Sequence, residues 1–171
     1  EVKAAWLRWV RFTGREVDAR PLAMVRVLVP LVLALDLLRA AQLGLVGDLF
    51  RPFGAGGLNS VHNSYAWLAA LSPEWAGPIA FGATLLALLA ASAGLGGRWS
   101  MLAAVALYAQ LGHICGPADR GIDRILRTVM LILVFSDAHL HYAVGRWRVG
   151  ARVQGWTQDL ITFLLVVIYL N

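Results

Sequence analysis

Charge is scarce in this sequence. Charged residues make up only 15% of the 171 residues, whereas hydrophobic residues make up 59% and the mean hydropathy is +0.66. A soluble domain carries roughly 25% charged residues, and about half of it or less is apolar. The few charges here bunch at the ends of apolar segments. The composition therefore excludes an ordinary soluble domain and predicts an integral membrane protein with the lipid bilayer as its partner.

Cysteine is nearly absent as well. The single cysteine, Cys115, cannot form an internal disulfide, so cysteine usage does not indicate a redox compartment. The phosphate-binding Gly-Lys-Ser/Thr loop, the dinucleotide fingerprint and the metalloprotease helix are also missing. Basic residues that flank membrane segments explain the net charge of +5 and the pI near 10.1. Because no DNA- or RNA-binding motif is present, we expect no nucleic-acid partner.

Long apolar runs are what the sequence does contain. About five of them are suited to transmembrane helices. The predicted spans cover residues of about 22–45, 78–95, 99–114, 121–138 and 156–171. Turn-forming residues predict an irregular connector over 46–64. Aromatic anchors predict an interfacial half-helix over 65–75, and arginines indicate a basic loop over 143–155. With no internal repeat, residues 1–171 are predicted to form one all-α domain, a bundle of about five transmembrane helices.

The first 18 residues mix aromatic and basic side chains, among them Trp6, Trp9 and Arg8. Such a segment is too charged to cross a bilayer and is typical of an amphipathic helix at its surface. With five spans and the N-terminus inside, the inner segments carry nine basic residues and the outer segments three. This excess of positive charge predicts a cytoplasmic N-terminus.

Ionisable residues concentrate between Asp119 and Trp147, around the fourth span. On one continuous helix, Asp123, Arg127, Asp137 and His141 would share one flank, and such groups in a membrane helix indicate a functional site. Asp137, His139 and His141 are candidate catalytic residues because a histidine can handle protons near neutral pH. The alternative is that they cap the helix at the interface. No metal site is predicted, since positions i and i+2 of a helix point apart.

Arginines and acids at the entrance of this span allow two interpretations. An Asp123–Arg127 ion pair would fix the helix start, or Asp123, Arg124 and Arg127 would bind an anion or cofactor. Two further candidate cofactor-binding residues, Arg26 and Asp36, lie in the first span. They are ten residues apart, about 15 Å along a helix, so each needs a partner elsewhere.

Four short stretches follow one another in a distinctive order. They are Val17–Arg26 leading into Leu33–Leu38, then Gly94–Arg98, then Gly121–Arg127, and last Phe135–Ala138 with His141-Tyr142. In this order they resemble the horizontally transferred transmembrane (HTTM) domain family, which is related to the membrane portion of vitamin K-dependent gamma-glutamyl carboxylase. The resemblance covers residues of about 17–147.

This resemblance implies a membrane fold in the bacterial cytoplasmic (inner) membrane. It also implies a pocket between helices for a quinone or quinol such as vitamin K, near Arg26, Asp36, Asp123, Arg127 and His141. The lysine associated with vitamin K hydroquinone deprotonation in true carboxylases would lie just beyond Asn171.

Three functions are compatible with the sequence. The first is a carboxylase-like membrane enzyme, a lyase. The second is a non-catalytic helical subunit of a larger membrane complex, favoured by spans rich in alanine and glycine that suit packing on other membrane subunits. The third, which the resemblance implies, is a maturation factor for secreted peptide toxins, because some members related to the HTTM family that consist of the membrane domain alone have this role.

Overall fold

The computed structural model describes residues 3, 6, 10, 14–59, 73–114, 119–140, 143–144 and 152–170. Of the described residues 78% are helical, and they form six α-helices and two short strands. The elements are β1 (Glu16–Asp18), α2 (Ala19–Gln42), α3 (Val46–Phe50), the 3-10 helix η1 (Phe53–Ala55), α5 (Pro73–Ala93), α6 (Arg98–Ile114), α7 (Gly121–Val134), the 3-10 helix η3 (Asp137–Leu140), β2 (Arg152–Gln154) and α8 (Trp156–Leu170). The prediction of a mainly helical fold is confirmed.

The longest helix, α2, begins after Asp18, which caps it. The Asp18 carboxylate accepts a hydrogen bond from the backbone N–H of Arg20 at 3.0 Å. Pro21 lies in the first turn, where its missing N–H leaves no hydrogen bond unmade. The helix covers 19–42 where the sequence predicts 22–45, because the cap starts it earlier and a turn at Gly44 stops it.

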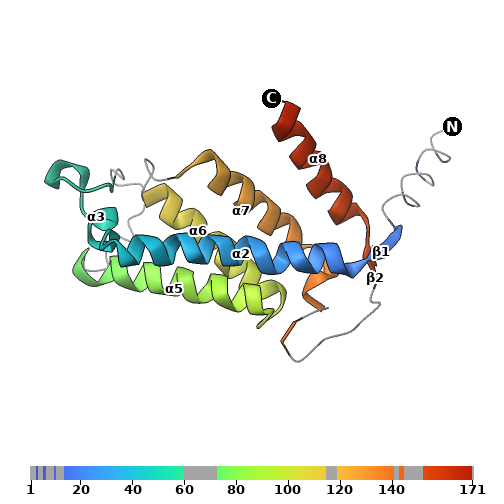
Figure 1. Ribbon diagram of the computed structural model, residues 1–171, viewed down its shortest axis with the longest axis horizontal. Coiled ribbons are helices and arrows are strands. Elements are labelled where there is room, and N and C mark those ends of the chain that lie inside the picture. The colour runs from blue at the N-terminus through green and yellow to red at the C-terminus, as the bar shows by residue number, and fades with distance from the viewer. Residues whose placement is uncertain are drawn as a thin grey trace.

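Four helices, α2, α5, α6 and α7, lie side by side as a bundle (Figure 1). Ala34, Ala91 and Ala104 are buried where these helices meet, which allows the backbones to approach closely. The Ser92 hydroxyl on α5 donates to the carbonyl of Val27 on α2 at 3.1 Å. By contrast, α8 packs against α7 and leans away from the bundle towards its C-terminal end (Figure 1).

The predicted interfacial helix over residues 1–18 is wrong at its end. Glu16–Asp18 forms strand β1, which pairs antiparallel with β2, so that Val17 lies opposite Val153. Strand β2 also replaces part of the predicted basic loop over 143–155. The pairing arises because the central valine of each strand turns inward between two exposed polar residues, a two-residue period that suits a strand.

The predicted span over 121–138 ends earlier, at Val134. The Ser136 hydroxyl donates to the carbonyl of Leu133 at 2.8 Å and accepts from the backbone N–H of Ala138 at 3.3 Å. These local bonds compete with the α-helical pattern and turn the chain into η3. Asp137 therefore does not continue the α7 flank that carries Asp123, and the predicted continuous stripe is interrupted.

The remaining predicted segments lie partly outside the described residues. The connector is irregular with brief helical turns over 46–59, as expected, whereas residues 60–72, which hold most of the predicted half-helix, are not described. Among the described residues, α2 alone is long and apolar enough to cross a bilayer, with a mean hydropathy of 2.1. A core helix of a soluble protein or a signal sequence passes the same test. The membrane setting and the five spans stay predictions.

Two of the long helices end at glycines with positive φ, Gly44 after α2 and Gly94 after α5. Their surroundings differ. A Cβ atom at Gly94 would collide with the side-chain nitrogen Nη1 of Arg26 and would lie 2.6 Å from the Cβ of Ala143, whereas at Gly44 it would meet nothing within 4 Å. The turn after α5 thus packs directly on the buried Arg26.

Substitution at these two glycines separates backbone strain from this contact. Gly94→Ala should lower the free energy of unfolding by about 1–3 kcal/mol more than Gly44→Ala, because both variants strain a positive φ but only the first overpacks the turn. Thermal unfolding of the two purified variants measures the difference. Equal losses would contradict the close approach of Arg26 to this turn.

Candidate functional site

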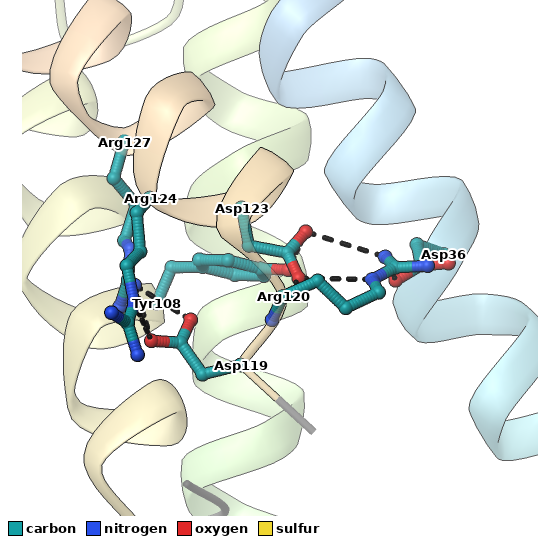
Figure 2. Close-up of polar contacts among 7 residues, drawn as sticks. All are labelled: Asp36, Tyr108, Asp119, Arg120, Asp123, Arg124 and Arg127. Carbon is teal, nitrogen blue, oxygen red and sulfur yellow. Dashed lines mark hydrogen bonds and ion pairs between the residues drawn. The ribbon is translucent and has the colours of Figure 1, made fainter. Parts of the chain in front are cut away.

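Arg120 joins two helices immediately before α7 begins. Its Nη2 atom lies 2.6 Å from Oδ2 of Asp36 on α2, and its Nε atom lies 3.1 Å from Oδ2 of Asp123 in the first turn of α7 (Figure 2). One guanidinium thus bridges two carboxylates that are 87 residues apart in sequence. Asp36 finds its partner on another segment of the bundle, as its position within a long apolar helix predicts.

Asp123 is the buried centre of this network. Its side chain is only 4% exposed and also accepts a hydrogen bond from the backbone N–H of Arg120 at 3.1 Å, which caps the start of α7. The Tyr108 hydroxyl on α6 donates to its other oxygen at 3.4 Å. A buried carboxylate costs several kcal/mol unless it is paired and hydrogen-bonded, and Asp123 has both kinds of partner. We call Asp36, Tyr108, Arg120 and Asp123 the three-helix network.

A second group of charges adjoins it at the same end of α7. Nη2 of Arg127 lies 2.6 Å from Oδ1 of Asp119, and Nε of Arg124 lies 3.0 Å from Oδ2 of the same carboxylate. Burial raises the pKa of Asp119, but the hydrogen bonds from Arg127 and Arg124 outweigh this and lower it overall. Gly112 on α6 makes room for the pair, because a Cβ there would lie 2.5 Å from Nη1 of Arg127.

The predicted Asp123–Arg127 ion pair is therefore wrong. Asp123 turns back to the cap and pairs with Arg120, while Arg127 reaches past the helix start to Asp119. Arg127 also lies 6.0 Å from the centre of the Tyr108 ring, which brings the two groups of charges together at α6 (Figure 2). The four-residue spacing along one helix favoured an Asp123–Arg127 pair, but tertiary packing produces the Arg120–Asp123 and Arg127–Asp119 pairs.

Two hollows adjoin these side chains. A cavity of about 110 Å³, large enough for a few water molecules, is lined by the carboxylates of Asp36, Asp119 and Asp123, by Tyr108 and by apolar side chains. A groove of about 600 Å³ between α2 and α7 is lined by Asp36, Arg39, Arg120 and Asp123 and by apolar residues of both helices. Asp36 and Asp123 border both hollows, so the three-helix network adjoins each of them.

The predicted cofactor residues divide between two places. Asp36, Asp123, Arg124 and Arg127 meet at one end of the bundle, as the sequence predicts. Arg26 does not join them, because it is buried at the other end of α2 against the turn after α5. Sequence reasoning did not select Tyr108 as a site residue. Its one available signal was a hydroxyl in the middle of an apolar helix, which is also typical of ordinary packing.

The predicted catalytic residues are not brought to this network. Asp137 begins η3, beyond the end of α7 and so at the opposite end of that helix from Asp123. The side chain of His139 and the whole of His141 lie outside the described residues. Within the described part of the chain, no group of three or more histidine, cysteine, aspartate or glutamate residues is placed to hold a metal ion.

Comparison with known proteins adds no family assignment: no family model, no curated protein and no solved structure matches this chain.

Neutralising a carboxylate of the network should destabilise the fold more than neutralising an exposed one. Asp123→Asn should lower the free energy of unfolding by about 2–4 kcal/mol, because it removes the charge of a buried, paired group while Arg120 and Tyr108 remain. Asp48→Asn is the matched control, since the Asp48–Arg51 pair is also three residues apart but about half exposed, and it should cost less than about 1 kcal/mol. Denaturant unfolding in detergent measures both, and similar costs would contradict the role assigned to Asp123.

Proposed function

We propose that this chain is a multi-pass integral membrane protein of the HTTM, carboxylase-like family, and that it binds a quinol or a similar small cofactor at the three-helix network. The proposal places it in the bacterial cytoplasmic membrane with the N-terminus inside. The observation that carries it is the Asp36–Arg120–Asp123 bridge, which sets charged groups between otherwise apolar helices beside a small pocket.

The outer surface of the bundle supports the membrane setting. Met24, Leu28, Val32 and Leu35 form one stripe along α2, and each is at least half exposed. Large apolar side chains are also exposed on α5, α6, α7 and α8, including Ile79, Leu86, Trp99, Leu131 and Phe163. Exposure of such an apolar surface to water is unfavourable, whereas contact with the hydrocarbon of a bilayer is not. The helix α2, of 24 residues, has the length of about 30 Å or more that a bilayer requires.

Membrane extraction tests this setting. After alkaline carbonate washing of membranes from cells that express the chain, it should stay in the pellet, because its exposed apolar surface has no stable place in water. A peripheral membrane protein of the same cells, released by the wash, is the control. Release of this chain into the supernatant would overturn the proposal.

The three-helix network has the chemistry that a quinol requires. Arg120 can donate to a quinone or quinolate oxygen, and the half-exposed Asp36 can accept a hydrogen bond from a quinol hydroxyl. The groove between α2 and α7 offers apolar walls to the ring and tail and leads directly to these groups. Because the charges of its two acids and two arginines balance, the groove suits a neutral ligand.

Quinone binding by the purified chain tests the site. A short-chain naphthoquinone should quench tryptophan fluorescence saturably, and Asp36→Asn and Arg120→Gln should each raise its Kd about tenfold, the loss of roughly one charge-assisted hydrogen bond. Arg51→Gln, in an exposed ion pair outside the network, should leave the Kd unchanged. No saturable binding, or equal effects of all three substitutions, would count against a quinol site here.

One observation favours the alternative of a non-catalytic subunit. On α8, Phe163 and Tyr169 are largely exposed and Val166 and Val167 are nearly half exposed. This helix leans away from the bundle (Figure 1). A helix with so much free apolar surface suits packing on other membrane subunits. Isolation of the intact chain by itself from mild detergent would speak against this function.

A further inference from the structure

A third hollow lies between α6 and α7, on the other side of α7 from the groove described above. Its volume is about 510 Å³, and we call it the α6–α7 groove. Asp119, Arg124 and Arg127 line it at the end where α7 begins. Deeper along the two helices its walls are apolar, formed by residues that include Val105, Ala109 and Leu131.

The charge of the α6–α7 groove is not balanced. Two guanidinium groups share the single carboxylate of Asp119, so one positive charge remains. Among the described residues, these ion pairs use only Nη2 of Arg127 and Nε of Arg124, so other N–H groups of both arginines are left to donate. The Arg124 side chain is 70% exposed, which makes its terminal nitrogens accessible to a ligand.

Polarity changes along the groove in one direction. Arg124 and Leu131 are seven residues apart on α7, which corresponds to about 10 Å along a helix. On α6, which runs antiparallel, Gly112 lies beside the ion pairs, and Ala109 and Val105 follow deeper in. A molecule with an anionic head and an apolar tail matches this order, since planar guanidinium groups suit phosphate oxygens.

We infer that the α6–α7 groove binds an anionic phospholipid, with its phosphate at Arg124 and Arg127 and an acyl chain along Val105, Ala109 and Leu131. This inference rests on the membrane setting proposed above. It concerns a different surface from the quinol site, because the groove between α2 and α7 carries balanced charge and the α6–α7 groove carries an excess of one positive charge.

Native mass spectrometry of the detergent-purified full chain tests it, with equal amounts of phosphatidylglycerol and phosphatidylcholine added. Wild type should retain phosphatidylglycerol over phosphatidylcholine by about fivefold or more, and Arg124→Gln should bring this ratio towards one. Asp119→Asn should raise the ratio, because it removes the carboxylate that competes with the phosphate. Because Arg124→Gln and Asp119→Asn are expected to change the ratio in opposite directions, either variant alone still tests the inference if the other folds poorly.

Arg39→Gln is the matched control, since Arg39 lines the groove between α2 and α7 at the same end of the bundle. An unchanged ratio in this variant supports the α6–α7 groove. A wild-type ratio near one, an equal loss in Arg39→Gln, or displacement of the lipid by inorganic phosphate at the same concentration would overturn the inference. If the chain stays in carbonate-washed membranes and binds quinone but shows no lipid preference, this inference alone fails.

Discussion

The contact on which the site depends is the bridge made by Arg120 between Asp36 and Asp123. It provides a buried carboxylate with an opposite charge and a hydrogen-bond donor, the two conditions under which such a group is tolerated away from water. It also connects α2 to α7, while the Tyr108 hydroxyl extends the connection to α6. Because the bridging residue precedes α7, its backbone can cap the helix while its side chain spans the gap to α2.

The polar groups of the bundle form two centres and not one. Arg26 and Asp36 lie on the same helix, but the separation of about 15 Å that their spacing implies takes Arg26 to the turn after α5 and Asp36 to the ion pairs. Arg26 is buried and lies so close to Gly94 that a side chain at that position would not fit. The hollows described above lie at the end with the ion pairs, and both proposed binding sites therefore belong to that end.

The sequence predicted the helices far better than it predicted their contacts. The starts of the predicted spans at 99, 121 and 156 fall within one residue of the observed helices, because glycines, prolines and charges interrupt the apolar runs there. The same apolar pattern carries no signal for the Ser136 bonds that end α7, or for the pairing of Val17 with Val153. The ion-pair partner of Arg127 was also predicted wrongly. Arg127 pairs with Asp119 and not with Asp123, because the space beside Gly112 that it occupies exists only once α6 has packed.

The two grooves beside α7 would place the two proposed ligands at the same helix start. Arg120 faces α2 and is matched by two carboxylates, whereas Arg124 and Arg127 face α6 and share one. With Arg39, the groove between α2 and α7 has two acids and two arginines, so the proposed neutral ring would meet balanced charge there. The excess positive charge of the α6–α7 groove would attract the proposed anion. In an apolar surrounding a single unbalanced charge matters more than it does in water. The distribution of acids and arginines around the start of α7 would thus decide which side of the helix accepts which of the two proposed ligands.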